Sequence, residues 1–198
     1  MNDFEKALFI IDMNNGFVNI GPMANPEYKK LVLEQLKAIK KTREEGGLVN
    51  FVLEGHHEGA KEFEAYPEHC VLGTSEALLI PELVGEADLP NTRTYYKNCI
   101  NGMLNRNLQD DLKNMKKLKQ VVIEGVCADL CVMDFARTMA RYFDEIDKDT
   151  AIYVVKNAID TFDAPGHNRE EWLTIARKVM EQAGIKYVDT YEDIERVK

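Results

Sequence analysis

The stretch ALFIID, residues 7–12, is a continuous apolar run that ends in a carboxylate. Apolar side chains at successive positions are typical of a strand that is buried on both faces of a parallel sheet. Runs of the same kind follow at residues 48–53, 121–126 and 151–155, and a weaker one lies at residues 185–188. We therefore expect a sheet whose central strands are covered on both sides.

Segments of helical length separate these runs. Their apolar residues recur every three or four positions, the spacing of an amphipathic helix, at residues 26–45, 103–117, 130–143 and 169–182. Alternation of strand and helix predicts βαβ units and therefore an α/β fold, a doubly wound and mostly parallel sheet in three layers with helices on both faces. Nothing in the sequence marks a second domain, so residues 1–198 are expected to form one.

Charge and composition limit the classes of partner. Asp and Glu number 34 against 25 Lys and Arg, a formal charge of -9. A surface of that sign repels phosphate backbones and anionic lipids, so neither nucleic acid nor membrane is an expected partner. No stretch approaches the about 20 apolar residues of a transmembrane helix, and the first residues do not resemble a signal peptide. We therefore expect a cytoplasmic protein with reduced cysteines at Cys70, Cys99, Cys127 and Cys131.

Polar side chains follow several of the predicted strands. Asp12 ends the first run, residues 54–57 follow the second, and residues 127–131 follow the third. Doubly wound sheets bind ligands at the carboxyl ends of their strands, so these groups are expected to share one rim. Residues 55–100 show little periodicity and are predicted to be a long irregular connection, a feature that is usually functional.

Cys131 is a candidate nucleophile. It follows the run at residues 121–126 and lies in the first turn of a helix with an apolar stripe over residues 132–143. The positive end of that helix would stabilise a thiolate and lower the pKa of Cys131, and free backbone N–H groups there could hold an oxyanion. A cysteine in this position can equally be a small buried hydrophobe. The segment alone does not separate these two interpretations.

Asp12 and Lys97 favour the catalytic interpretation of Cys131. A carboxylate at the end of a neighbouring strand could accept the thiol proton and later return it to a leaving amine. Lys97 precedes the predicted helix at residues 103–117, and a lysine close to both groups would favour their ionised forms. A lone aspartate at the end of a strand can instead cap a turn or a helix, which is the alternative here.

A second group of polar side chains follows the second run. Glu54, His56 and His57 stand together, and His69 lies in the segment YPEHCVLGT, residues 66–74. Two imidazoles and a carboxylate that converge can bind a divalent transition metal such as zinc, with water at the open positions. Histidines gathered in a loop are also often solvent-exposed polar residues, and spacing alone does not exclude this.

Three motifs, taken together and in this order, carry a family resemblance. They are IDMNNGF at residues 11–17, Lys97 with a glycine five residues later, and GVCADLCV at residues 125–132. This set resembles the signature of the isochorismatase-like cysteine hydrolases, a superfamily that includes nicotinamidases and N-carbamoylsarcosine amidohydrolases. The resemblance extends over nearly the whole chain and is strongest to the nicotinamidases.

The resemblance implies roles for the residues of these motifs. Asp12 becomes the base, Lys97 its electrostatic partner and Cys131 the nucleophile. The backbone N–H groups of Cys127 and Cys131 become the oxyanion hole, and a cis peptide bond is implied between Val126 and Cys127. A homo-oligomer is also implied.

The segment around His69 is similar to the metal-binding block of nicotinamidases. That match implies Glu54, His56 and His69 as ligands of a divalent metal ion, zinc or another transition metal. Glu54 replaces the usual aspartate and adds one methylene. The sequence does not choose an additional ligand among three further candidates, His57, Glu62 and Glu64.

Phe17 and Tyr66 are the implied substrate-binding residues. Phe17 matches an aromatic residue of the family pocket, and Tyr66 stands where nicotinamidases commonly carry tryptophan. Aromatic walls suit a flat ring, although both residues could equally be core. The predicted activity is hydrolysis of a small carboxamide to acid and ammonia through a thioester, with nicotinamide as the first expected substrate. The alternatives are a carbamoyl compound or other small amide, and a noncatalytic binding module on the same fold.

The remaining polar residues are expected to be structural. Asp129 is expected to cap the nucleophile helix. His167 is expected to lie in a polar turn before the helix at residues 169–182, with Asn168 as the N-cap. Trp172 is expected to pack on the inner face of that helix.

Overall fold

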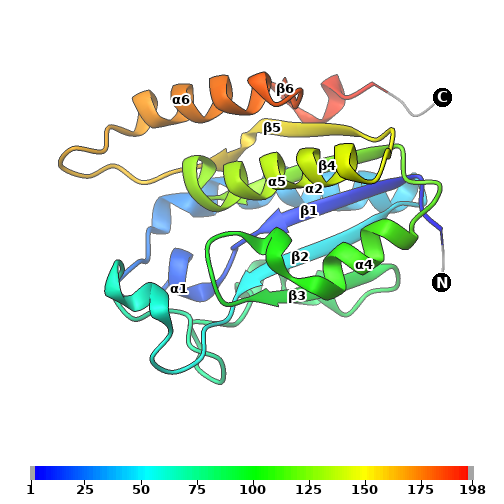
Figure 1. Cartoon of the computed structure of the whole chain (residues 1–198). Helices are drawn as coiled ribbons and strands as arrows, with labels where there is room; N and C mark the ends of the chain where they lie inside the picture. The colour runs from blue at the N-terminus through cyan, green and yellow to red at the C-terminus, as the bar shows by residue number, and fades with distance from the viewer. Residues whose placement is uncertain (1–2, 196–198) are drawn as a thin grey trace.

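One sheet organises the residues that the computed structural model describes, 3–195 (Figure 1). Its strand order is β3-β2-β1-β4-β5-β6, and every neighbouring pair is parallel. The strands are β1 (Lys6–Ile11), β2 (Leu48–Glu54), β3 (Thr92–Lys97), β4 (Gln120–Val126), β5 (Ala151–Asp160) and β6 (Lys186–Val188). The predicted doubly wound α/β fold is confirmed, with a sheet that is parallel throughout.

Helices cover both faces of the sheet and give the molecule three layers (Figure 1). One apolar core lies under α4 (Arg106–Asn114), α5 (Met133–Glu145) and α6 (Arg169–Gln182). The other lies under α1 (Asn15–Val18), α2 (Val32–Glu44) and α3 (Pro81–Ala87). Short 3₁₀ turns occur at Pro26–Leu31, Lys61–Glu64, Gly102–Leu104 and Tyr191–Asp193. Within the described residues, no helix is long and apolar enough to cross a bilayer.

Helix α5 shows how the sequence pattern becomes packing. The apolar residues of its stripe are buried: Phe135, Ala136, Met139, Ala140 and Phe143. The ring of Phe135 lies 5.3 Å from that of Phe9 on β1, between centroids. The predicted stripe is present, but the α-helix begins only at Met133, because Ala128–Val132 forms a π-helical turn.

The sequence prediction missed strand β3. This strand lies within residues 55–100, which were expected to be irregular, and forms one edge of the sheet. An edge strand is less covered than a central one, and the polar sequence TRTYYK lacks the apolar run of a buried parallel strand. Only Tyr95 and Lys97 are buried in it. Helix α3 lies in the same region, so the prediction of an irregular connection is wrong for both elements.

The direction of the strand order reverses between β1 and β4. In open α/β sheets the ligand crevice lies at such a reversal, beyond the carboxyl ends of the strands. Gly125, near the end of β4, has a φ of 119°. A Cβ at this position would lie 2.0 Å from the carbonyl oxygen of Ile11 on β1. Glycine is therefore required at this position for the close approach of β1 and β4, the two strands on either side of the reversal.

Candidate active site

Asp12, Lys97 and Cys131 come together at the carboxyl ends of three strands. Asp12 follows β1, Lys97 is the last residue of β3, and Cys131 lies in the turn after β4. Lys97 Nζ lies 2.9 Å from Asp12 Oδ2 and 3.8 Å from Cys131 Sγ. All three side chains are buried. The geometry gives a proton acceptor, a cation and a thiol in direct contact.

Burial sets the protonation of the Asp12–Lys97 pair. Burial raises the pKa of Asp12 to about 7, against the opposing positive charge of Lys97, and the charge of Glu54 adds to the rise. Burial lowers the pKa of Lys97, but the negative charges around it outweigh this and hold that pKa well above its ordinary value. Lys97 is therefore a permanent cation, whereas Asp12 can gain or lose a proton near neutral pH.

The expectation of a low pKa for Cys131 is wrong. Burial raises the pKa of this thiol well above its ordinary value, and the charge of Lys97 only opposes that effect. The partial positive charge at the helix N-terminus does not compensate for the thiolate's loss of hydration, because Cys131 is only 6% exposed. The thiol form of Cys131 is therefore favoured over the thiolate.

The turn that carries Cys131 begins with a cis peptide bond between Val126 and Cys127, as the family resemblance implied. Cys127 and Cys131 both line the cavity described below. Cys127 Sγ lies 3.4 Å from the hydroxyl of Tyr28 in a hydrogen bond, and burial raises the pKa of the Cys127 thiol to about 12. The assignment of oxyanion donors to the backbone N–H groups of Cys127 and Cys131 stays a prediction.

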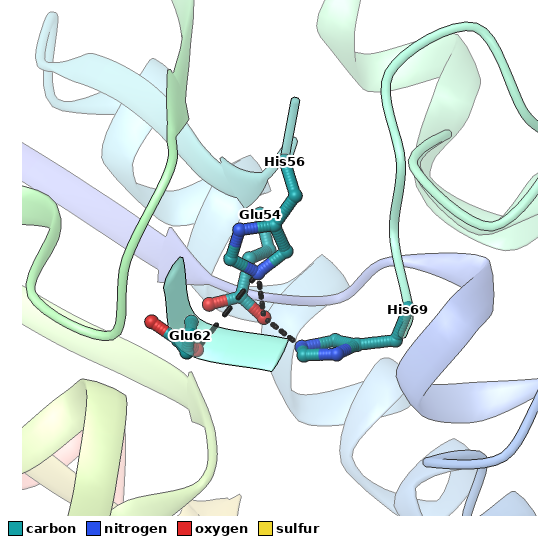
Figure 2. Close-up of side chains that lie close together, drawn as sticks. All are labelled: Glu54, His56, Glu62 and His69. Atoms are coloured by element: carbon teal, nitrogen blue, oxygen red, sulfur yellow. Dashed lines mark hydrogen bonds and ion pairs between the residues drawn. The ribbon is translucent and has the colours of Figure 1, made fainter. Parts of the chain in front are cut away.

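A second cluster lies next to the first and contains two carboxylates and two imidazoles (Figure 2). One ligand atom from each of Glu54, His56, Glu62 and His69 lies within 4.8 Å of all the others. Glu54 Oε2 lies 2.9 Å from His69 Nε2 and 3.7 Å from His56 Nε2. His56 Nε2 lies 3.8 Å from Glu62 Oε1. The cluster could hold a metal ion, and it contains all three predicted ligands.

Other contacts orient the two imidazoles toward this cluster. His69 Nδ1 lies 2.7 Å from the carbonyl oxygen of Pro67, and His56 Nδ1 lies 3.3 Å from Asn98 Oδ1. Contacts of this kind fix the rings of metal-ligating histidines. His56 Nε2 is buried and has no hydrogen-bond partner among the described residues. A buried nitrogen that faces two carboxylates fits a metal cation, so the donor set suits the implied ion.

The structure separates the three candidates for an additional ligand. Glu62 belongs to the cluster, and its Oε2 also accepts a hydrogen bond of 3.0 Å from the backbone N–H of Ile100. His57 and Glu64 are exposed, and Glu64 pairs with Lys61 at 2.6 Å. Glu62 is therefore the fourth donor of the cluster.

Glu54 joins the two clusters. Its Oε1 accepts a hydrogen bond of 2.6 Å from Lys97, and its Oε2 faces the imidazoles. Burial raises the pKa of Glu54, but the positive charge of Lys97 and the nearby imidazoles of His56 and His69 outweigh this effect and hold the pKa of Glu54 well below its ordinary value. Burial lowers the pKa of His69, yet the hydrogen bonds to Glu54 and Pro67 raise it overall. One carboxylate thus serves both groups.

Both clusters open into one cavity of about 870 Å³. Phe17 and Tyr66, the predicted substrate-binding residues, line it together with Cys131, Glu54 and His69. The ring of Phe17 lies 5.4 Å from that of His69, between centroids. An aromatic wall beside a thiol and a group of donors is an arrangement that suits a small flat ligand.

Comparison with known proteins identifies the family of this chain. A model of the isochorismatase domain matches residues 6–184. The chain belongs to the isochorismatase family. It is 32% identical to nicotinamidase 1 of Arabidopsis thaliana over 182 residues, which cover 83% of this chain and 73% of that protein.

Two solved structures are also similar to the chain. The pyrazinamidase of Pyrococcus horikoshii in complex with zinc is 25% identical, with a TM-score of 0.75 over 93% of this chain and 99% of that one. The N-carbamoylsarcosine amidase of Thermoplasma acidophilum is 25% identical, with a TM-score of 0.75 over 97% and 99% of the two chains. The predicted family and the predicted enzyme class, a hydrolase acting on C–N bonds, are confirmed.

Sequence reasoning missed two residues that contact the imidazoles of this isochorismatase-family site. Phe63 packs edge-on against His56 at 5.0 Å and lies 5.7 Å from His69, between ring centroids. Asn98 contacts His56 Nδ1 and also accepts from the backbone N–H of His57 at 3.0 Å. Asn98 follows Lys97 directly, so a search among the neighbours of the predicted site lysine could have found it. Phe63 lies in an irregular segment and gives no such signal.

Proposed function

We propose that this protein is a cysteine-dependent amidase that hydrolyses a small carboxamide, with nicotinamide as the first expected substrate. The observation that carries the proposal is the contact of Asp12, Lys97 and Cys131 beside a cluster of metal-binding type in one cavity. The 32% identity to a plant nicotinamidase supports the choice of substrate.

In the first stage, Cys131 Sγ attacks the carboxamide carbon. Asp12 accepts the thiol proton. The positive charge of Lys97 stabilises the single negative charge that Asp12 and Cys131 share during this transfer. The oxyanion is held by the backbone N–H groups of Cys127 and Cys131. Asp12 then gives its proton to the leaving nitrogen, the C–N bond breaks, and ammonia departs from a thioester.

In the second stage, water attacks the thioester carbon. Asp12 accepts a proton from the water, the C–S bond breaks, and the proton returns to Cys131 Sγ. The products are one carboxylic acid and one ammonia for each amide and water consumed. Asp12 therefore serves as base in both stages, for which a pKa of about 7 is suited near neutral pH.

Glu54, His56, Glu62 and His69 are the proposed ligands of a divalent metal ion, zinc by preference. Imidazole and carboxylate are common zinc ligands. A bound ion would act as a Lewis acid that anchors a neutral donor such as a pyridine nitrogen. Phe17 and Tyr66 would pack against the ring and orient its carboxamide toward Cys131.

Ammonia release tests the proposal. The purified protein is incubated with nicotinamide, pyrazinamide and ureido compounds, and ammonia is measured with a coupled assay. Cys131→Ala is expected to abolish ammonia release from every accepted substrate while circular dichroism shows an intact fold. Full activity of Cys131→Ala would end the cysteine mechanism, and activity on ureido compounds without activity on nicotinamide would end the substrate assignment.

A related amidase that acts on a carbamoyl compound is the second candidate. It is favoured by the 25% identity to an N-carbamoylsarcosine amidase and by two substitutions, Glu54 and Tyr66, in the block that resembles nicotinamidases. We also propose a cytoplasmic location. We further propose a homo-oligomeric assembly, which size-exclusion chromatography with light scattering would test.

A further inference from the structure

Asp129 lies in the π-helical turn midway between Cys127 and Cys131. It is only 3% exposed, and both of its carboxylate oxygens have partners. Oδ2 lies 2.8 Å from His167 Nε2, and Oδ1 accepts a short hydrogen bond from the hydroxyl of Thr161. The expectation that Asp129 caps the nucleophile helix is therefore wrong, because its side chain is directed toward the segment after β5.

His167 is fixed on both faces and at both ring nitrogens. Its ring is stacked between Phe162 at 3.8 Å and Trp172 at 4.9 Å, with interplanar angles of 10° and 5°. Nδ1 lies 3.1 Å from the carbonyl oxygen of Phe162, and Nε2 faces Asp129. A ring held in this way has one orientation, which is more than a polar surface turn requires.

Two parts of the chain that are distant in sequence meet at this histidine. One is the turn after β4, residues 127–131, called the nucleophile turn below. The other is the loop at residues 161–168 together with helix α6, which that loop joins to β5 (Figure 1). Thr161 and Phe162 line the catalytic cavity. Asp129 and His167 do not line it in the part of the chain that the structure describes. The Asp129–His167 contact therefore connects the wall of the cavity to the nucleophile turn on the side away from the cavity.

The nucleophile turn is held by backbone hydrogen bonds and by the contacts of Asp129. Its backbone closes through a hydrogen bond of 3.1 Å from the Val132 N–H to the Cys127 carbonyl. π-helical turns are rare and occur frequently at functional sites. No side chain caps this turn at Cys127 or the following helix at Val132. The Asp129 carboxylate, placed between the two cysteines, is thus well placed to fix the turn against its surroundings.

We propose that Asp129 and His167 are positioning residues that lock the nucleophile turn to the wall of the cavity. They act through the backbone of residues 127–131, which carries the Cys131 thiol and the predicted oxyanion donors. The inference rests on the proposed function for its kinetic consequence. A displacement of about 1 Å in the attacking geometry costs up to about 100-fold in rate, so loss of the lock affects kcat more than KM.

Four variants separate the hydrogen bonds from the stacking. Asp129→Ala removes the carboxylate, and Asp129→Asn keeps its shape with one acceptor fewer. His167→Phe keeps a stacked ring without hydrogen bonds, and His167→Gln keeps a donor without the ring. We expect kcat to fall about 100-fold in Asp129→Ala and about tenfold in His167→Phe, with KM changed less than about threefold, and His167→Gln to retain more activity than His167→Phe. Thr174→Ala, on the exposed side of α6, is the matched control.

A second measurement needs no amide substrate. The rate of alkylation of Cys131 by iodoacetamide is followed by peptide mass spectrometry. Because the locked thiol is buried, release of the turn is expected to raise this rate about threefold or more in Asp129→Ala and His167→Phe. Thr174→Ala should alkylate at the rate of the parent protein.

The outcomes decide the lock separately from the substrate. A kcat within about twofold of the parent, with an unchanged alkylation rate, in both Asp129→Ala and His167→Phe would overturn the lock. If Asp129→Ala does not fold, His167→Phe decides, since it preserves the stack between Phe162 and Trp172. If the parent protein hydrolyses no amide, the proposed function fails, while the alkylation series still supports or overturns the lock.

Discussion

Two pairs of histidine and buried carboxylate flank Cys131, and they are nearly identical in isolation. His69 Nε2 lies 2.9 Å from Glu54, and His167 Nε2 lies 2.8 Å from Asp129. Both imidazoles also place Nδ1 against a backbone carbonyl oxygen. Distance and residue type therefore do not distinguish the two pairs.

The residues around each pair distinguish the two. The Glu54 pair faces a second imidazole and a second carboxylate, and His56 Nε2 is left without a hydrogen-bond partner among the described residues. The Asp129 pair is closed, since Thr161 occupies the other carboxylate oxygen and two rings stack on the imidazole. A group with converging, unsatisfied donors can take up a cation, whereas a fully satisfied group can only hold its surroundings in place.

The largest expected effect is on zinc affinity, which is expected to depend on the Glu54 pair and not on the Asp129 pair. His69→Ala removes one ligand, so zinc affinity is expected to fall by at least about 100-fold, measured by competition with a chromophoric chelator. His167→Phe is the matched control, and its zinc affinity should stay within about twofold of the parent. Zinc binding by His69→Ala that equals the parent would show that the ion, if bound, sits elsewhere.

The next effect concerns pH. Because burial raises the pKa of Asp12 to about 7, this carboxylate takes up a proton as the pH falls through that value and can no longer accept one from Cys131. We expect kcat/KM to fall about tenfold for each pH unit on the acid side. A profile that stays flat between pH 5 and pH 8, measured at saturating zinc, would contradict Asp12 as the base.

The two pairs should also differ in the pH profile of Cys131 alkylation. The charge of Glu54 contributes to the raised pKa values of both Asp12 and Cys131, so Glu54→Gln is expected to move the acid limb of this profile to lower pH. His167→Phe should leave the midpoint of the same profile unchanged, because its lock acts on geometry. A shifted midpoint in His167→Phe would mean that this pair acts electrostatically.

The sequence made one pair predictable and left the other unrecognised for a physical reason. Glu54 ends an apolar strand and His56 follows it, so the rim of a parallel sheet brings them together. Asp129 and His167 meet only because the loop after β5 folds back over the nucleophile turn. Neither periodicity nor spacing encodes such a contact between a loop and a turn. Asn168, whose cap depends on neighbours in sequence, was predicted correctly and accepts from the Glu171 N–H at 3.0 Å.

The same reasoning explains how far the group of Asp12, Lys97 and Cys131 could be predicted. Asp12 and Cys131 follow central strands with strong apolar runs, and their juxtaposition follows from the fold. Lys97 belongs to an edge strand that the composition did not reveal. It entered the prediction as a lysine just ahead of a predicted helix, and the family motif then implied its role. Its position opposite Glu54 in the register of β2 and β3 became visible only in the structure. Among the additional ligand candidates, Glu62 was selected by the path of its loop and not by spacing.

The smallest expected effect is on the free energy of unfolding and concerns a buried carboxyl group that has no histidine partner. Glu124 lies in the middle of β4, is fully buried, and has no hydrogen-bond partner for either oxygen among the described residues. Burial, with a smaller contribution from Glu34 and Glu192, holds the pKa of Glu124 well above its ordinary value of 4.5. The folded protein therefore keeps a proton that the unfolded chain releases.

The sign of the pH effect follows from that difference. Stability contributed by protonated Glu124 is present below the unfolded pKa and is lost as the pH rises toward the folded pKa. Glu124→Met removes the unsatisfied group at similar volume and is expected to raise the free energy of unfolding by about 1–3 kcal/mol at neutral pH. Glu124→Gln should gain less, because its amide is left without a partner. Urea denaturation at pH 5 and pH 8 measures both variants, and a Glu124→Met protein no more stable than the parent at pH 8 would mean that the buried carboxyl is already satisfied, in the manner of Asp129.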